Sequence, residues 1–246
     1  MAKNSIKNSF LIATNRDYPT HAKRVVDQLE SFGALDNGEI VICCPFELND
    51  KRIRFIKDLK SQNGNVAFNA AATESRGEYI YILCDDHYIS NTIIHGDEFL
   101  SSPTFLYRKY KIASMTSGGP CYIGPIPNFP QTDFIPINIM SRFPFFTREM
   151  YIKYLNGYVF HPNFNICSHF ADNYLSYFLA INNEPAVESS YIYLNPMPNT
   201  DYQDGSVEPY GGPERKYPTG YVESLAIYVD LCKNLNRGDP HVTVEK

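Results

Sequence analysis

The sequence is short of positive charge, has no long apolar run and contains no tryptophan. Lys and Arg number 22 against 27 Asp and Glu, a net charge of −5, so the chain has no global positive field to attract a nucleic-acid backbone. The longest uncharged stretches, Ile112–Thr132 and Tyr154–Ala171, are broken by Pro, Gly, Asn and His. We expect neither stretch to cross a bilayer. These absences argue against a general nucleic-acid binder and against a transmembrane protein.

Cysteine is present, but not in the pattern of a disulfide scaffold. No two of the six cysteines have CxxC spacing, and Cys43 and Cys44 are adjacent. The start of the chain, MAKNSIKNSF, is basic but does not lead into the apolar core of a signal peptide. We therefore expect a cytoplasmic protein whose cysteines are mostly small core residues. The six are Cys43, Cys44, Cys84, Cys121, Cys167 and Cys232.

Aromatic residues are abundant, with 19 Tyr and 16 Phe. Such a bias can line a cleft for a sugar or a nucleotide, or it can fill an aromatic core with partly buried Tyr. Composition leaves both interpretations open. With 43% hydrophobic and 20% charged residues, the 246-residue chain can bury one substantial core. We expect a single domain spanning 1–246.

Strand-like and helix-like segments alternate in the first half of the chain, which is typical of an α/β sheet covered by helices. Apolar runs predict strands at 10–14, 39–44, 78–84 and 191–194. Apolar residues at helical spacing predict helices at 20–33, 50–60, 69–75, 147–155, 170–181 and 221–235. Pro and Gly crowd 117–136, which predicts a long surface loop, and regular structure is expected to resume at 137–140.

Two adjacent aspartates, Asp85 and Asp86, follow the predicted strand 78–84. In open α/β sheets ligands bind in the crevice outside the carboxyl ends of the strands, so this position makes the pair a site candidate. Neighbouring carboxylates repel each other unless a cation offsets them. Mg²⁺ or Mn²⁺ does so with one or two carboxylates and leaves positions for phosphate oxygens. An ordinary polar turn with an Asx cap is the alternative interpretation, and His87 is either a further metal ligand or a surface histidine.

The segment from Asn69 to His87 closely resembles a signature of the family-two nucleotide-sugar glycosyltransferases of the GT-A fold. Their pattern has an Asn, then eight residues later a Gly in Gly-Glu-Tyr-Ile, an apolar strand and DxD-type aspartates. Here Asn69 and Gly77 keep that spacing, and Asp85 and Asp86 follow the strand. The resemblance implies a GT-A-like, Rossmann-like mixed sheet with helices on both faces. It also implies a nucleotide-sugar half at about 1–110 and an acceptor half at about 111–246.

Weaker matches flank this signature. Thr14-Asn15-Arg16 is similar to the family turn that touches the nucleotide, and Ala171-Asp172-Asn173 is similar to the Glu-Asp motif whose aspartate is the catalytic base. The resemblance therefore implies Asp172 as base and Asp86 as metal ligand, with Asp85 at the ribose or the metal's water shell. Arg76 is a cation that can meet a diphosphate, although a plain surface role stays open. The predicted nucleotide contacts are Thr14, Asn15, Arg16, Asn69, Arg76 and Asp85.

The sequence departs from the family in two places. The family's second strand usually ends in an Asp that contacts the base or ribose, whereas this chain has Cys43-Cys44-Pro45 there and its nearest acid is Glu47. Cys84 stands where the first aspartate of the DxD motif often lies. These departures keep open a non-catalytic binding or scaffold protein with the same fold.

The resemblance implies a hexosyltransferase that uses Mn²⁺ or Mg²⁺ and a nucleoside-diphosphate sugar and that inverts the anomeric centre. Its acceptor would be a carbohydrate or glycolipid, as in polysaccharide biosynthesis, with peripheral membrane contact possible and no nucleic-acid partner. A nucleotidyltransferase is a lower-ranked alternative, because no glycine-rich, basic triphosphate loop follows the first predicted strand.

Overall fold

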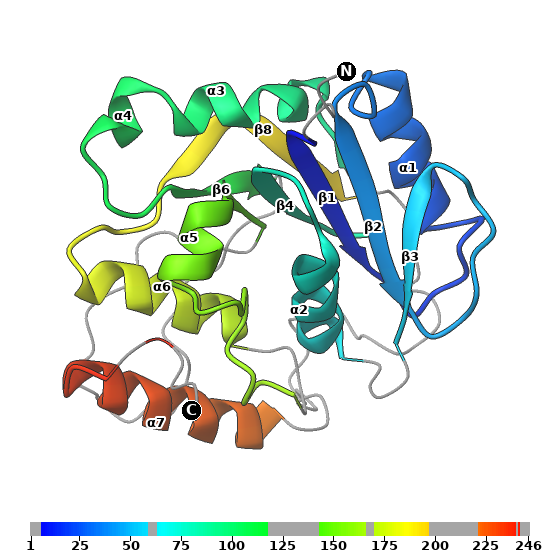
Figure 1. Cartoon of the computed structure of the whole chain (residues 1–246). Helices are drawn as coiled ribbons and strands as arrows, with labels where there is room; N and C mark the ends of the chain where they lie inside the picture. The colour runs from blue at the N-terminus through cyan, green and yellow to red at the C-terminus, as the bar shows by residue number, and fades with distance from the viewer. Residues whose placement is uncertain are drawn as a thin grey trace.

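An eight-stranded mixed sheet runs through the computed structural model of the chain (Figure 1). The structure describes residues 6–58, 63–117, 143–165, 170–196, 221–239 and 241. The strands are β1 (Asn8–Ala13), β2 (Gly38–Cys44), β3 (Ile53–Lys57), β4 (Tyr79–Leu83), β5 (His87–Ile89), β6 (Ile112–Ser117), β7 (Pro144–Thr147) and β8 (Glu188–Pro196). Their order is β3-β2-β1-β4-β7-β6-β8-β5. The first four are parallel, and β7 joins them antiparallel to β4.

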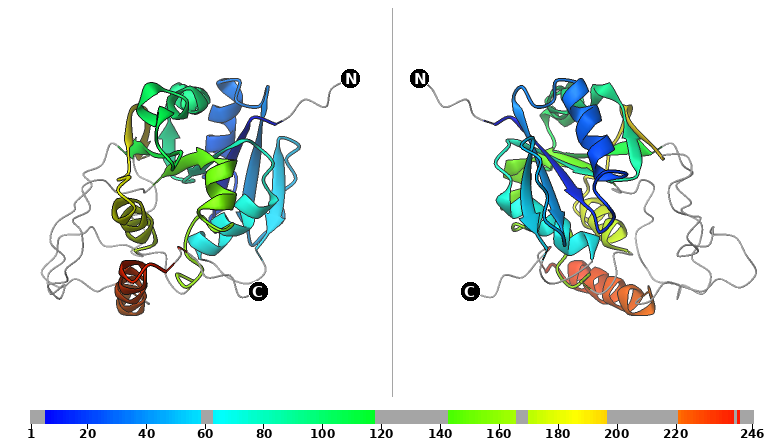
Figure 2. Two further views of the ribbon diagram at one scale, coloured as in Figure 1. Left: turned by 60° about the vertical axis from the view of Figure 1, so that its left-hand side comes forward. Right: turned by 90° about the vertical axis from the view of Figure 1, so that its right-hand side faces the viewer.

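Helices cover both faces of this sheet (Figure 2). They are α1 (Ala22–Ser31), α2 (Gly64–Glu74), the 3₁₀ helix η1 (Asn91–His95), α3 (Gly96–Leu100), α4 (Pro103–Leu106), α5 (Arg148–Lys153), α6 (Ala171–Ile181) and α7 (Tyr221–Asn236). Buried residues of α1, η1, α3 and α4 share one apolar cluster. Those of α2, α5, α6 and α7 share another. The predicted mixed α/β sheet with helices on both faces is confirmed.

The two clusters follow from the period-two alternation of side chains along a strand. In β1, Phe10 and Ile12 belong to the cluster that contains Val25 of α1, whereas Leu11 belongs to the cluster that contains Ala71 of α2. All five side chains are fully buried. Complete burial of each large apolar side chain contributes about 1.5–3 kcal/mol. A strand that is buried on both faces therefore appears in the sequence as an unbroken apolar run, as β1 and β2 do.

Most predicted elements are present with shifted ends. The predicted strands correspond to β1, β2, β4 and β8, and the predicted helices 20–33, 69–75, 147–155, 170–181 and 221–235 correspond to α1, α2, α5, α6 and α7. Helix α2 begins earlier than predicted because Asn63 caps it, its side chain accepting a 2.8 Å hydrogen bond from the Asn65 backbone N–H. The predicted loop 117–136 lies outside the described residues except for Ser117, which ends β6, and the segment 137–140 lies wholly outside them.

The predicted helix at 50–60 is wrong, because residues 53–57 form the edge strand β3. Ile53 and Ile56 lie three residues apart, which suits a helix, but the segment pairs in parallel with β2 from Ile40↔Ile53 to Cys44↔Lys57. Tertiary pairing outweighs local periodicity here, as it does for many short strands.

The aromatic residues fill the core. Tyr81 is fully buried and stacks on Phe10 at 4.9 Å and on Phe145 at 5.6 Å between ring centroids. Such pairs add about 0.5–1.5 kcal/mol beyond burial of their area. Of the two interpretations of the aromatic composition, the core explains these rings.

Two buried histidines whose rings contact aromatic residues of α6 make stability depend on pH. His161 and His241 are buried with ring centroids 6.1 Å apart, and burial lowers the pKa of His161 to about 4 and that of His241 to about 3. In the unfolded chain the histidine pKa is near 6.5, so below that pH the unfolded chain binds more protons than the folded one. The contribution of the two histidines to the free energy of unfolding is therefore fully present above about pH 6.5 and falls as the pH drops. Each histidine removes about 1.4 kcal/mol per pH unit in that window.

We therefore expect the free energy of unfolding in urea to fall steeply between pH 6.5 and 4, with the slope roughly halved in His241→Phe. The exposed His95 provides the matched control, and His95→Gln should keep the full slope. An unchanged slope in His241→Phe would show that other groups cause the acid sensitivity.

Candidate active site

The register of two strands brings the first pair of site residues together. β1 and β4 are parallel, with Ile12 opposite Leu83. Thr14 and Asp85 each lie two residues after this pair. The hydroxyl of Thr14 donates a 2.5 Å hydrogen bond to Asp85 Oδ2. Both side chains are buried. The predicted nucleotide contacts Thr14 and Asp85 are thus adjacent at the carboxyl edge of the sheet.

Arg16 and His87 approach the acidic pair from two sides. Arg16 Nη1 lies 3.4 Å from Asp85 Oδ1 and 3.2 Å from Asp86 Oδ2. The other Asp86 oxygen, Oδ1, lies 2.6 Å from His87 Nδ1. The backbone N–H of Arg16 donates a 3.1 Å bond to the Thr14 hydroxyl, which holds the turn after β1 in place. Asp86 therefore has a separate polar partner on each of its oxygens.

These surroundings shift the two carboxyl groups in opposite directions. Burial raises the pKa of Asp85 above its usual value, and the Thr14 hydrogen bond and the Arg16 charge only partly offset that effect. Burial also disfavours ionised Asp86, but the hydrogen bond and charge of His87, together with Arg16, outweigh it and lower the pKa to about 2. Asp86 is therefore the more firmly ionised of the pair.

A cleft of about 300 Å³ borders the acidic pair, at the lower end of the size range of small-molecule sites. It lies where the four parallel strands end, the usual ligand position in open α/β sheets. Its lining comes from the ends of β1 (Ala13, Thr14, Asn15, Arg16), β2 (Pro45), β3 (Asp58) and β4 (Cys84, Asp85, Asp86) and from the start of α2 (Asn63, Gly64, Ala67). Five predicted site residues, Thr14, Asn15, Arg16, Asp85 and Asp86, thus share one cleft.

Asp58 is the acidic lining residue that sequence reasoning missed. Its backbone N–H donates a 2.8 Å bond to Cys44 O, which extends the pairing of β2 and β3 to the cleft. The acid that follows β3 therefore lies next to the end of β2, where the sequence lacks an aspartate. The mistaken helix at 50–60 concealed this position, since only a strand ending at Lys57 places the next residue at the sheet edge. Glu47, the nearest acid in sequence, has an 81% exposed side chain.

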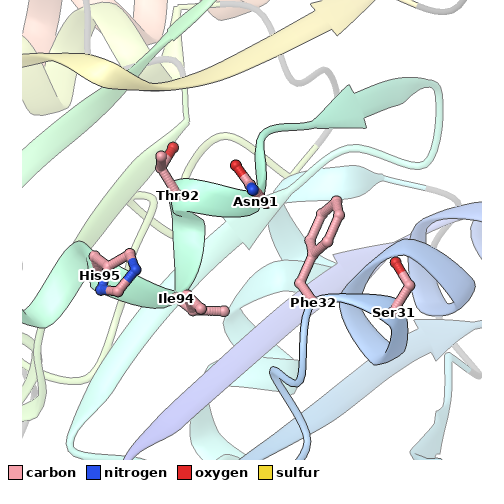
Figure 3. Close-up of a pocket in the computed structure, with 6 residues that line it drawn as sticks. All are labelled: Ser31, Phe32, Asn91, Thr92, Ile94 and His95. Atoms are coloured by element: carbon pink, nitrogen blue, oxygen red, sulfur yellow. The ribbon is translucent and has the colours of Figure 1, made fainter.

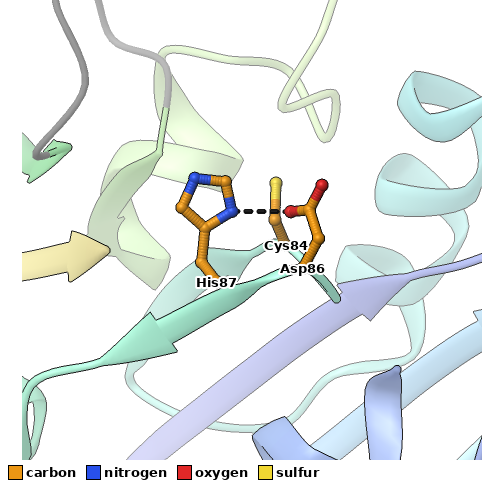
Figure 4. A group of neighbouring side chains, drawn as sticks. All are labelled: Cys84, Asp86 and His87. Atoms are coloured by element: carbon orange, nitrogen blue, oxygen red, sulfur yellow. Dashed lines mark hydrogen bonds and ion pairs between the residues drawn. The ribbon is translucent and has the colours of Figure 1, made fainter. Parts of the chain in front are cut away.

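The end of β4 also offers donor atoms for a metal ion (Figure 4). One ligand atom each from Cys84, Asp86 and His87 lie within 4.8 Å of one another. The donor set of sulfur, carboxylate oxygen and imidazole nitrogen suits a divalent cation. Asp86, the predicted metal ligand, is thus part of a group of donors.

No family model and no curated protein sequence matches this chain. Its structure, however, is similar to solved glycosyltransferases. A mannosyltransferase from Pyrobaculum calidifontis in complex with GDP-Man and Mn²⁺ has a TM-score of 0.53 at 12% identity, covering 81% of this chain and 59% of its own. S. aureus TarS 1–349 with UDP-GlcNAc has a TM-score of 0.51 at 12% identity, covering 91% and 66%. Glucosyl-3-phosphoglycerate synthase from Mycobacterium tuberculosis with Mn²⁺, UDP and glucosyl-3-phosphoglycerate has a TM-score of 0.50 at 10% identity, covering 95% and 81%.

The fold is the GT-A fold. The predicted fold class is confirmed by these matches, whose low identities establish the fold alone. The chain spans about 60% of the length of the first structures it matches. Among the described residues, no helix is long and apolar enough to span a membrane.

In this GT-A fold Arg76 does not line the cleft, and its contact with the nucleotide stays a prediction. Arg76 precedes β4, at the edge of the sheet opposite Asp85, and its Nη2 lies 2.9 Å from Glu39 Oε2. Its backbone N–H also donates to Glu39, as does the hydroxyl of Ser9. Burial raises the pKa of Glu39, but these hydrogen bonds outweigh it and lower the pKa overall. Arg76 therefore neutralises a buried carboxylate at the amino ends of the strands.

Asn69 is also used by the fold rather than by the cleft. Its amide N–H donates a 2.8 Å bond to Phe160 O, and its carbonyl accepts a 3.1 Å bond from Phe160 N–H. These two hydrogen bonds connect α2 to the segment that precedes α6, and they use both the N–H and the carbonyl of the carboxamide. Asn69 is not part of the cleft lining. Its contact with the nucleotide stays a prediction, and the contacts observed are with Phe160.

Asp172 lies in the first turn of α6, and its Oδ1 accepts a 2.9 Å hydrogen bond from the Asn173 backbone N–H. An acidic residue in the first turn suits the helix dipole. Its assignment as the catalytic base stays a prediction.

A second hollow of about 320 Å³ lies between the end of α1 and η1 (Figure 3). The described residues that line it include no carboxylate, lysine or arginine, and the one titratable side chain among them, His95, lies 3.1 Å from Glu98. A single histidine that already contacts Glu98 is a poorer partner for a diphosphate or a metal than two carboxylates beside an arginine. The cleft beside Asp85 and Asp86 is the better candidate for the active site.

Proposed function

We propose that the chain is a metal-dependent glycosyltransferase that transfers a sugar from a nucleoside-diphosphate sugar to an acceptor hydroxyl with inversion. The observation that carries this proposal is the Asp85–Asp86 pair, held beside Arg16 in a cleft at the carboxyl ends of four parallel strands. Similar structures that were solved with Mn²⁺ and GDP-Man or UDP support this donor class.

The cleft residues have distinct roles in holding the donor. Arg16, whose side chain is 36% exposed, can turn its guanidinium from the carboxylates to the diphosphate. Thr14 and Asn15 bring the backbone after β1 close to the nucleotide. Asp85, which is buried against Thr14, accepts a ribose hydroxyl or a water bound to the metal. Asp86 is the ionised ligand for Mn²⁺ or Mg²⁺.

Transfer breaks the bond between the anomeric carbon and a phosphate oxygen, and its electron pair leaves with the diphosphate. A bound divalent cation stabilises the charge that develops on that leaving group. Asp172 takes the proton from the acceptor hydroxyl as the acceptor oxygen bonds to the anomeric carbon. Attack on the face opposite the leaving group inverts the centre. The acceptor in this proposal is a carbohydrate or a glycolipid.

A non-catalytic binding protein on the GT-A fold is the second candidate. It is favoured by Cys84, because a thiol replaces an acid that the related motif often carries. Such a protein would bind the nucleotide without transferring the sugar.

The proposal is tested by thermal shift of the full chain with UDP, GDP, CDP or dTDP, each with and without Mn²⁺. A ligand at about 100 times its Kd adds roughly 2.7 kcal/mol of stability. We expect one nucleotide to stabilise the protein only when Mn²⁺ is present, and its monophosphate to have a much smaller effect. The matching nucleotide sugar should then be hydrolysed slowly.

Two outcomes would count against this function. No shift with any nucleotide would contradict the donor site altogether. Metal-dependent binding without any hydrolysis or transfer across a panel of sugars and acceptors would favour the binding protein.

A further inference from the structure

We propose that Cys84, Asp86 and His87 form a three-donor site that selects a thiophilic divalent cation, such as Zn²⁺ or Co²⁺, over Mg²⁺. The inference rests on the proposed function only for what the bound cation does, which is to hold the diphosphate. Binding of the cation by these three side chains does not depend on that function. Its basis is that one ligand atom from each residue lies within 4.8 Å of the others.

The turn between β4 and β5 explains why these three side chains converge. β4 ends at Leu83 and β5 begins at His87, so Cys84 and Asp86 lie in the intervening turn. The Cys84 sulfur, the Asp86 carboxylate and the His87 ring all project to the same side of that turn (Figure 4). His87 Nδ1 and Asp86 Oδ1 are already 2.6 Å apart.

The spacing is compatible with a shared ion after small rotations. Typical metal distances of about 2.3 Å to sulfur and 2.0–2.1 Å to nitrogen or oxygen place two ligands of a tetrahedral ion roughly 3.3–3.7 Å apart. The separations here are all within 4.8 Å, so a shared ion requires the three ligand atoms to move closer together by rotation about their side-chain bonds. Cys84 is only partly buried.

The chemistry of the donors determines the selectivity. Mg²⁺ requires oxygen ligands in near-octahedral geometry, whereas thiolate and imidazole favour Zn²⁺, Co²⁺ and similar ions. A bound ion of this class deprotonates its cysteine, and the thiolate and the Asp86 carboxylate then balance its two positive charges. Cys84 and Asp86 both line the cleft, so an ion held there is accessible to a phosphate oxygen. Asp85 keeps its own partners, Thr14 and Arg16.

The decisive experiment is a Co²⁺ titration of the full chain, followed by absorption spectroscopy. Thiolate ligation gives a sulfur-to-cobalt charge-transfer band, and we expect that band in the wild type and its loss in Cys84→Ser. Cys44→Ser is the matched control, because Cys44 is buried and its Sγ donates to Phe46 O, a bond that serine can keep. The control should retain the band. His87→Gln should weaken Co²⁺ binding by about tenfold or more.

Two measurements on the unmodified protein keep the test independent of how the variants fold. Equimolar Zn²⁺ should displace Co²⁺, whereas Mg²⁺ at about a hundredfold excess should not. Zn²⁺ should also protect Cys84 from alkylation, as read by mass spectrometry of its peptide. Any of three results would overturn the inference. The charge-transfer band could persist in Cys84→Ser, Co²⁺ could bind to the wild type without giving the band, or equimolar Mg²⁺ could displace Co²⁺.

Failure of this inference can be distinguished from failure of the proposed function. If the wild type shows no charge-transfer band but still binds a nucleoside diphosphate with Mn²⁺, the three-donor site is wrong and the donor site stands. If the band is present but no nucleotide binds, the metal site stands and the glycosyltransferase proposal fails.

Discussion

Replacing Asp86 with asparagine should abolish Mn²⁺-dependent nucleotide binding and lower nucleotide-sugar turnover by about a thousandfold. Asparagine keeps the shape of the side chain but removes the charge that a cation requires. Loss of the metal removes several kcal/mol of transition-state stabilisation, and about 4 kcal/mol corresponds to a thousandfold in rate. The measurement is the initial rate of donor hydrolysis or transfer at saturating Mn²⁺, compared with thermal shift by the nucleotide.

The variant must be assayed well below its melting temperature, because Asp86 also contributes to stability. Its pKa of about 2, against a usual 3.8, corresponds to about 2 kcal/mol that is present above pH 4 and lost on acidification. Asp230, an exposed residue of α7, provides the control for net charge. Asp230→Asn should keep full turnover. Unchanged turnover in Asp86→Asn would remove Asp86 from the metal site.

The part of the site that could be predicted from the sequence is local in the chain. Asp85 and Asp86 follow β4 directly, and Thr14 to Arg16 follow β1 directly. An apolar run identifies each strand, and a parallel sheet brings the carboxyl ends of its strands to one edge. These two facts are sufficient to place both segments in the same cleft before the strand order is known.

Residues whose positions depend on pairing could not be predicted in this way. Asp58 reaches the cleft only because β3 pairs with β2 at the sheet edge, and the local spacing of Ile53 and Ile56 favours a helix. His87 is adjacent to Asp86 in sequence, yet its ring position depends on β5 pairing with β8, more than a hundred residues later. Such long-range pairing leaves little trace in a local pattern.

The predicted nucleotide contacts Asn69 and Arg76 show a different limit. Asn69 keeps the spacing of the family pattern, and Arg76 precedes its glycine. The side chain of Asn69 binds the backbone of Phe160, and that of Arg76 binds the carboxylate of Glu39. A residue that a fold requires and a residue that a ligand requires can have the same sequence spacing. Only their positions and contacts in the structure distinguish them. Arg76 precedes β4, whereas Asp85 follows β4 and lies at the cleft.

Gly77, in the same signature, should be among the most sensitive positions for stability. A Cβ on Gly77 would lie 2.6 Å from the carbonyl carbon of Asn8 and from the nitrogen and Oγ of Ser9, so β4 would have to move away from β1. The Gly77 N–H donates a 2.7 Å bond to Ser9 Oγ, and its carbonyl accepts one from Arg148. We expect Gly77→Ala to lower the free energy of unfolding in urea by about 3 kcal/mol or more, since overpacking against backbone cannot relax by side-chain rotation.

Gly64 provides the matched control for this substitution. A Cβ there meets nothing within 4 Å, and Gly64 is the first residue of α2, where alanine has the better helix propensity by up to about 1 kcal/mol. Gly64→Ala should therefore leave stability unchanged or raise it. A loss below about 1 kcal/mol in Gly77→Ala would contradict the close approach. The pairing that Gly77 permits continues from Asn8↔Tyr79 to Ile12↔Leu83, and it ends by placing Thr14 beside Asp85. The signature glycine thus acts on the cleft from the far end of β4, through the register of the two strands.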